Sequence, residues 1–128
     1  PAVERASGDK LWFKNGKIHR EDGPAIECEY RKEWWVNGNQ HREDGPAVEH
    51  SDGSKFWFKN GHQHRLDGPA IECVDGRTEW YNNNQRHRLD GPAVECEDGR
   101  KEWWIDGVEH IPKPDKTVMI DGIEYFPI

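Results

Sequence analysis

The hydrophobic pattern of this chain repeats. The tetrapeptide Pro-Ala-(Val/Ile)-Glu recurs at Pro1, Pro24, Pro46, Pro69 and Pro92, with steps of 23, 22, 23 and 23 residues. Two adjacent aromatic residues follow ten or eleven positions later in every copy, and the first four copies end in His-Arg-x-Asp-Gly. Repetition at one period predicts a tandem array of small supersecondary units. The expected units are 1–23, 24–45, 46–68, 69–91 and 92–111.

The second copy is one residue shorter than the others. The missing residue lies near Tyr30, where the other copies have a Gly-containing pair: Ser7-Gly8, Asp52-Gly53, Asp75-Gly76 and Asp98-Gly99. Such pairs are typical of turns. We therefore expect the shortening to fall in a turn and to leave the strands intact.

A second turn in each unit is predicted by Asn-Gly at 15–16, 37–38 and 60–61, by Asp106-Gly107, and by the Asn82–Asn84 run in the fourth copy. Asn-Gly favours a type I′ hairpin, whose two central residues need positive φ. With this turn, Trp35 faces Gln40 and Val36 faces Asn39. The same register pairs a Trp with a His in every unit, namely Trp12 with His19, Trp34 with His41, Trp57 with His64, Trp80 with His87 and Trp103 with His110.

The apolar runs are too short for helices, so the pattern predicts an all-β, elongated, single-sheet antiparallel hairpin repeat. Pro at Asp-Gly-Pro cannot donate to a sheet ladder and should mark a corner between strands. Two strands per unit would repeat every ~10 Å. Residues 112–128 depart from the repeat and are expected to form a capping hairpin, because terminal repeats need one.

Two rows of aromatic residues follow from this stacking. We expect the invariant row to fill the core, since every unit needs the same large side chain at its centre. The second row points to the opposite face and is expected to be an exposed partner surface. The invariant row is Trp12, Trp34, Trp57, Trp80 and Trp103, and the second row is Phe13, Trp35, Phe58, Tyr81 and Trp104.

Composition adds limits on function. Leu, Ile, Val and Phe supply only 22 of 128 residues and the net charge is −7, which resembles a disordered chain, but seven Trp indicate a folded one. Acidity argues against nucleic acid as a partner. No apolar run of 18 residues predicts a membrane span, and no N-terminal segment resembles a secretion signal, so we expect a cytoplasmic protein.

The 23-residue unit with its aromatic pair, Asn-Gly, His and Asp-Gly resembles the MORN repeat, in the variant with the H-R-x-D-G-P-A signature. The resemblance runs from Pro1 to about His110. It implies a β-hairpin solenoid that acts as a scaffold or binding module, as in repeat arrays of phages, large viruses and bacterial antitoxin-type proteins; a viral source would place it in the host cytoplasm. Arg20, Arg42, Arg65 and Arg88 stand where the common pattern has Gly, and with the acidic charge they argue against membrane binding.

Three Cys and seven His raise the question of a metal site. Cys28, Cys73 and Cys96 share one position of the repeat, with His50 in the third unit. At ~10 Å between units these side chains can neither share a tetrahedral ion nor form a disulfide. We expect free structural thiols, no metal and no cofactor.

The repeated His-Arg-x-Asp-Gly string favours structure over catalysis, because an enzyme needs one site and not four equivalent ones. We expect Asp to close the turn, Arg to bridge to a carboxylate of its own or the next unit and His to stack on Trp. The alternative is an edge that binds an extended anionic partner. The structural row comprises His19, His41, His64, His87 and His110 with Arg20, Arg42, Arg65 and Arg88.

If repetition marks structure, specificity should lie where the units differ, beside the Asn-Gly turns. The leading hypothesis is a non-catalytic protein-interaction module, with an antitoxin-like or host-directed inhibitor that occludes its partner as one form of it. One alternative is a small-molecule or nucleotide binder with pockets between the aromatic and Arg rows. Another is a self-assembling element or edge-paired homodimer. Candidate partner-binding residues are the second aromatic row with Lys14, Lys59, His62 and Arg86.

Overall fold

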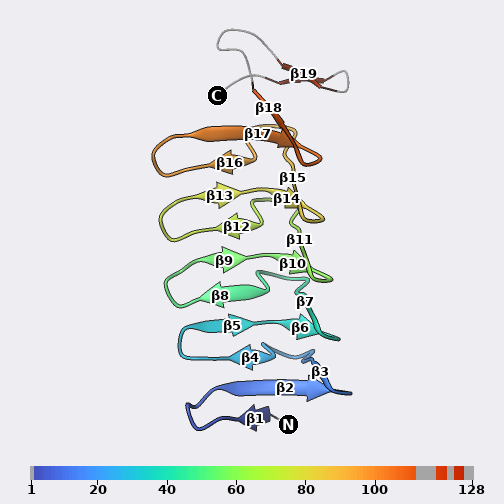
Figure 1. Ribbon diagram of the computed structural model, residues 1–128, viewed down its shortest axis with the longest axis vertical. Coiled ribbons are helices and arrows are strands. Elements are labelled where there is room, and N and C mark those ends of the chain that lie inside the picture. The colour runs from blue at the N-terminus through green and yellow to red at the C-terminus, as the bar shows by residue number, and fades with distance from the viewer. Residues whose placement is uncertain (1, 112–117, 121–122, 126–128) are drawn as a thin grey trace.

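The computed structural model describes residues 2–111, 118–120 and 123–125 and is all-β. One open antiparallel sheet of twelve strands runs through the molecule (Figure 1). Its order is β1 (Ala2–Glu4), β2 (Lys10–Lys14), β4 (Ile26–Glu27), β5 (Arg31–Glu33), β8 (Val48–His50), β9 (Lys55–Phe56), β12 (Ile71–Glu72), β13 (Thr78–Glu79), β16 (Val94–Glu95), β17 (Lys101–Ile105) and β18 (Val108–His110), with β3 (Lys17–Ile18) beside β2. The predicted all-β antiparallel class is confirmed.

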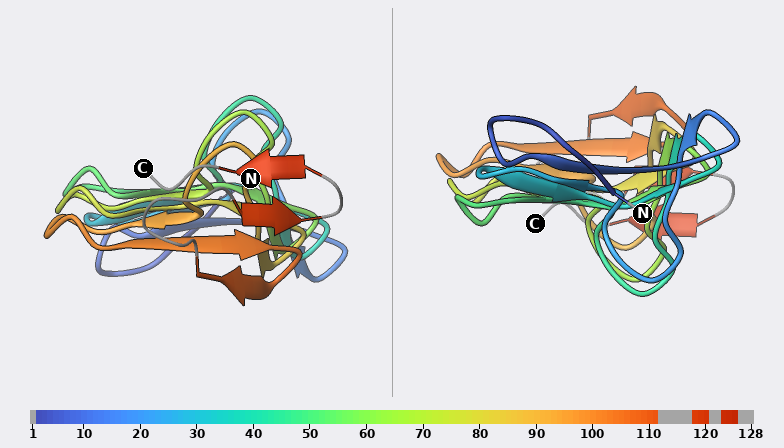
Figure 2. Two further views of the ribbon diagram at one scale, coloured as in Figure 1. Left: turned by 90° about the horizontal axis from the view of Figure 1, so that it is seen from above. Right: turned by 90° about the horizontal axis from the view of Figure 1, so that it is seen from below.

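Small hairpins accompany this one large sheet. In the middle units the Asn-Gly hairpins leave the main sheet and form two-stranded sheets of their own. Seen along the stack, these hairpins stand at an angle to the main sheet (Figure 2). They are β6 (Trp35–Val36) with β7 (Asn39–Gln40), β10 (Phe58–Lys59) with β11 (His62–Gln63), and β14 (Tyr81–Asn82) with β15 (Gln85–Arg86).

The invariant Trp is the residue at which the chain turns from the main sheet into the hairpin. The N–H of Trp34 donates to the carbonyl of Ala47 in the main sheet at 2.7 Å, while its carbonyl accepts from the N–H of His41 in the hairpin at 3.0 Å. Trp12, Trp57 and Trp80 make the equivalent pair of bonds. The predicted pairing of Trp with His is therefore confirmed, and in the middle units it marks the corner between the main sheet and the hairpin.

The Asn-Gly turns have the predicted conformation. Asn37 and Gly38 have φ of 50° and 80°, as a type I′ turn requires. In the fourth unit Asn83 and Asn84 take the same places with φ of 48° and 67°. The shortened turn at Tyr30 is also confirmed, because Cys28 N–H bonds to the carbonyl of Arg31, where longer copies bond residues four apart.

The core differs from the expectation. It is formed by the small aliphatic residues of Pro-Ala-(Val/Ile)-Glu and not by the invariant Trp row, whose members are half-buried. The buried aliphatic residues are Leu11, Ala25, Ile26, Ala47, Val48, Ala70, Ile71, Ala93, Val94 and Ile105. The four Ala residues of the motif, Ala25, Ala47, Ala70 and Ala93, are fully buried.

Residues 118–120 and 123–125 form one further hairpin, β19 (Val118–Ile120) with β20 (Ile123–Tyr125). The rest of the predicted capping segment 112–128 lies outside the described residues. In the described part of the chain there is no helix long and apolar enough to cross a membrane.

Candidate binding site in the row of loops

Each invariant Trp in the first four units carries an Arg of its own unit on its ring. The guanidinium carbon lies 3.9 Å from the Trp12 ring centroid for Arg20, 3.8 Å from Trp34 for Arg42, 4.0 Å from Trp57 for Arg65 and 4.2 Å from Trp80 for Arg88. A cation over an indole face is the strongest geometry of this kind. The expected stacking of His on Trp is therefore wrong, and Arg takes that place.

The Gly of His-Arg-x-Asp-Gly is required by the same stack. A Cβ on Gly68 would lie 2.7 Å from the Arg65 guanidinium carbon, and one on Gly45 would lie 3.1 Å from that of Arg42. Each guanidinium is thus held between an indole ring and a Gly backbone. A side chain at this Gly would have to displace the Arg.

The edges of the guanidinium are bonded to carboxylates, as expected. Arg42 donates to Asp44 at 3.1 Å, to the carbonyl of Pro46 at 3.1 Å and to Glu49 at 3.1 Å. Asp44 belongs to the same unit and Glu49 to the next one, so the Arg fixes the Asp-Gly-Pro corner and joins two units. Arg20 and Arg65 repeat all three bonds.

The His row joins neighbouring hairpins, which the sequence did not indicate. Nδ1 of His19, His41, His64 and His87 accepts from the first central N–H of the next unit's turn, at 2.9 to 3.2 Å. The second central N–H, as in Gly38, donates to a carbonyl of the preceding unit, here Ile18 at 2.9 Å. The hairpins therefore stack in one register along the array.

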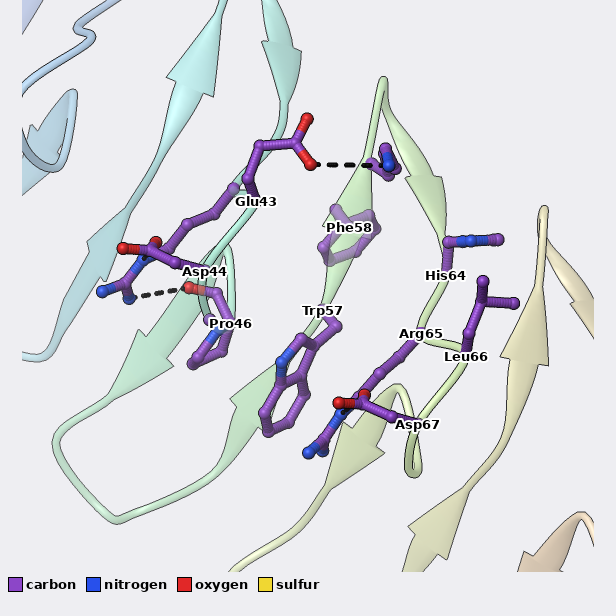
Figure 3. A pocket seen from close by; sticks show the side chains of 12 residues that line it. Glu43, Asp44, Pro46, Trp57, Phe58, His64, Arg65, Leu66 and Asp67 are labelled. Atoms are coloured by element: carbon purple, nitrogen blue, oxygen red, sulfur yellow. Dashed lines mark hydrogen bonds and ion pairs between the residues drawn. The ribbon is translucent and has the colours of Figure 1, made fainter.

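Three similar slots open between successive His-Arg-x-Asp-Gly loops. Each lies between one loop and the invariant Trp of the following unit, with cavity volumes of about 720, 530 and 470 Å³. In the middle slot, Figure 3 shows the Trp57 ring between the Asp44–Pro46 segment on one side and Arg65 on the other. One face of the ring carries Arg65, and the Asp44–Pro46 segment forms the wall opposite it.

The variable residue of each loop changes the character of the slots along the array. It is Glu21 and Glu43 in the first two loops, and Leu66 and Leu89 in the next two. Leu66 is 75% exposed. The Asp of every loop is also exposed, from Asp22 to Asp90. The first slot is therefore acidic, and the third combines Asp with apolar surface.

The loop Arg side chains do not make these slots basic. Each Arg from Arg20 to Arg88 lies within 4 Å of two carboxylates. Glu43 is further paired with Lys59 at 3.4 Å and with His41 at 2.8 Å, and the hydrogen bond from His41, with the charge of Lys59, lowers the pKa of the Glu43 carboxyl. An anionic ligand would meet carboxylates at the mouth of the slots.

The second aromatic row is linked to a carboxylate in three units, and that carboxylate is buried at Glu33 and Glu79 and half-buried at Glu102. Glu33, 7% exposed, accepts from Trp35 Nε1 at 3.0 Å and from Gln40 at 2.9 Å, and it is paired with Arg31. Burial raises the pKa of the Glu33 carboxyl, but hydrogen bonds from Arg31, Gln40 and Trp35 outweigh burial and hold that pKa below its ordinary value.

The residue two places before each ring of the second aromatic row, equivalent to Glu33, matches the polarity of that ring. Glu79 accepts from the Tyr81 hydroxyl at 3.0 Å, and Glu102 accepts from Trp104 Nε1 at 2.9 Å. Where the ring is Phe13 or Phe58, which has no polar atom, the position holds Leu11 or Phe56. A ring that carries an N–H or O–H thus comes with a carboxylate acceptor.

The structure places the predicted partner-binding residues in different surroundings. Phe58, Lys59 and Tyr81 line slots, whereas Lys14 and His62 are exposed on the hairpins. Arg86 stacks on Trp104 at 5.0 Å and pairs with Glu79 at 3.2 Å. Of the second aromatic row only Phe13 is exposed, and the others are half-buried like the invariant row. The premise that burial separates the two rows is therefore wrong.

The loop residues that line the slots were missed as binding candidates. Their signal was the single variable letter inside His-Arg-x-Asp-Gly, which changes from Glu to Leu between the second and third copies. The other four positions are the same in every copy, which favours a structural role for the string, with a binding edge as the alternative.

The three Cys are free and half-buried. Within residues 2–111 and the β19–β20 hairpin, no group of three or more His, Cys, Asp or Glu is placed to hold a metal ion. Comparison with family models, curated proteins and solved structures gives no match.

Proposed function

We propose that this chain is a non-catalytic module that binds another protein along the row of His-Arg-x-Asp-Gly loops. The observation that carries the proposal is the line of three slots, each with an indole wall and exposed Asp residues, set at the period of the repeat. Repeated equivalent sites suit an extended partner that contacts several units at once, as in other solenoids. They do not suit a single reaction centre.

The exposed Leu66 and Leu89 support a protein partner. They stand on neighbouring loops at 75% and 44% exposure and line the third slot together. Exposed apolar residues beside an aromatic ring are typical of the central part of a protein interface. Occlusion of a partner, as in an antitoxin-like or host-directed inhibitor, is one way in which such a module would act.

The test is capture from a lysate of the source with three immobilised proteins: wild type, the Leu66→Glu/Leu89→Glu variant, and Val74→Glu as control. Val74 is 64% exposed and lies on a turn outside the three slots. A protein that wild type and the Val74 variant retain, and that the loop variant loses, supports the proposal. Loss only with the Val74 variant would contradict it.

A small-molecule binder is the second candidate, because the slots are separate and similar. Titration calorimetry distinguishes the two, since independent slots would bind several ligands per chain and an interface one partner. The carboxylates around the loop Arg side chains argue against nucleotides as the ligand.

A further inference from the structure

The loop row carries an inference about the chemistry of the partner, which rests on the proposed function. We infer that the slots bind an extended, basic segment of another protein in polyproline II conformation, with a cationic side chain at every third residue in the first two slots and an apolar residue in the third.

The loop Arg side chains of the protein indicate which kind of ligand group each slot would accept. Arg65 lies on one face of the Trp57 ring and donates to Asp67 at 3.1 Å. On the other side of the same ring is the slot, whose opposite wall holds Asp44. A guanidinium or ammonium entering the slot would therefore find an indole ring and, at the opposite wall, the exposed Asp44 carboxylate that Arg42 also contacts at 3.1 Å.

The charge of the row favours a basic partner. Four Arg face Asp22, Asp44, Asp67 and Asp90 together with Glu27, Glu49, Glu72 and Glu95. Glu21 and Glu43 add two further carboxylates, in the first and middle slots, and Lys59 in the middle slot pairs with Glu43 at 3.4 Å, so carboxylates still outnumber cations along the row. This excess would attract cations and speed their association.

The change from Glu to Leu gives the row a direction. Glu21 and Glu43 line the first slot, and Leu66 and Leu89 line the third. A bound segment should thus place its cations toward the N-terminal units and an apolar side chain against Leu66 and Leu89.

The spacing selects the conformation of the segment. Each unit adds two strands to the main sheet, so the slots repeat every ~10 Å. Polyproline II rises ~3.1 Å per residue with three residues per turn, so every third side chain returns to the same face after ~9 Å. A β-strand would point every third side chain alternately toward and away from the row. Grooves lined by aromatic rings are a known setting for polyproline II segments.

The experiment measures fluorescence anisotropy of dye-labelled peptides with the purified chain. Three peptides share one composition of Arg, Pro and one Leu: the first has Arg at every third position, the second has the Arg residues adjacent, and the third has Arg at every second position. The first peptide should bind at least about fivefold tighter than the other two, because only its cations meet successive slots. Equal affinity of all three peptides, or no binding of the first, would overturn the inference.

A pair of matched variants tests the site. Glu21→Gln/Glu43→Gln should weaken binding of the first peptide at least about fivefold, since it removes the two Glu carboxylates that line the first and middle slots. Glu97→Gln/Glu109→Gln makes the same charge change at exposed positions outside the three slots and should leave binding within about twofold. Equal weakening by both variants would mean that the peptide binds through general charge attraction, and this would overturn the inference.

The two proposals fail in different ways. If the lysate partner depends on Leu66 and Leu89 while none of the peptides binds, the loop row is an interface and the basic segment is wrong. If neither lysate capture nor peptide binding depends on the loops, the proposed function fails as well. Circular dichroism and melting of every variant, recorded beforehand, show that the chains compared are folded.

Discussion

The backbone N–H of Asn37 donates to Nδ1 of His19, 2.9 Å away in the preceding unit. The same bond joins each of the first four His residues of the row to the next hairpin, so a side chain, in addition to the main sheet, sets how far apart the hairpins stand. The acceptor must be the unprotonated nitrogen, which fixes the tautomer of each ring.

Replacing one of these acceptors should loosen the stack. His41→Ala leaves the N–H of Asn60 without its 3.0 Å partner and should lower the free energy of unfolding by about 1 kcal/mol. His62→Ala is the control, because His62 is exposed and bonds only the Asn84 side chain among the bonds described. Urea denaturation followed by Trp fluorescence measures both; equal losses would contradict the role of the His row.

The Arg in each loop should stabilise the fold by more than its charge alone provides. Arg65→Ala removes the stack on Trp57 and three hydrogen bonds, and we expect a loss of about 1 to 3 kcal/mol. Arg65→Lys keeps the charge but not the flat donor edge, so most of the loss should remain. The exposed Arg5 gives a matched Ala control. Full stability of Arg65→Lys in urea would show that charge alone suffices.

Glu33 and Trp35 should show coupled energies. Trp35→Phe leaves the buried Glu33 short of a donor, and Glu33→Leu leaves the indole N–H without its acceptor, so each single change should cost about 1 to 3 kcal/mol. The double change recreates the Leu11 and Phe13 pair of the first unit. It should therefore cost less than the sum of the single changes. A double-mutant cycle from urea unfolding measures this; additive losses would mean that the pair is not coupled.

Acid should remove the contribution of Glu33 to the stability of the fold. Its folded pKa lies below the ordinary value, so its stabilisation is complete above the unfolded pKa and is lost as pH falls through the folded pKa. Wild type should thus lose more stability on acidification from pH ~7 to below pH ~4 than Glu33→Gln does. Melting across this range checks the difference, and parallel curves for the two proteins would refute it.

All three thiols should be reactive once the chain is unfolded. In the folded chain, burial raises the pKa of the Cys73 thiol, which leaves less thiolate at neutral pH. Alkylation of Cys73 should therefore be slower before unfolding than after it, as followed by mass spectrometry of peptides. A mass deficit of two hydrogens in the unreduced protein would instead reveal a disulfide.

Much of the unit could be predicted because its turns have local signatures. Asn37-Gly38 needs positive φ at both residues, and this alone sets the pairing of Trp34 with His41. The register of each hairpin, the lost turn residue near Tyr30 and the antiparallel class follow from such short-range chemistry.

The departure of the hairpins from the main sheet could not be predicted in the same way. It depends on Trp34, whose N–H and carbonyl bond to different sheets, and no sequence pattern reports that division. The stacking of Arg42 on Trp34 was missed for a related reason. Nothing along the chain shows that the planar cation eight residues later, and not the His, lies over the ring.

The turns on the two sides of the main sheet differ in how strictly their length and sequence are determined. The turn between β8 and β9 is exposed at Ser51, Asp52 and Gly53, and its counterpart near Tyr30 has already lost a residue without breaking the sheet. These turns project on the side of the sheet away from the hairpins (Figure 1). They are suitable attachment points for a reporter peptide or a fluorophore, because an attachment there would leave the slots beside the Trp rings open and the proposed binding surface unchanged.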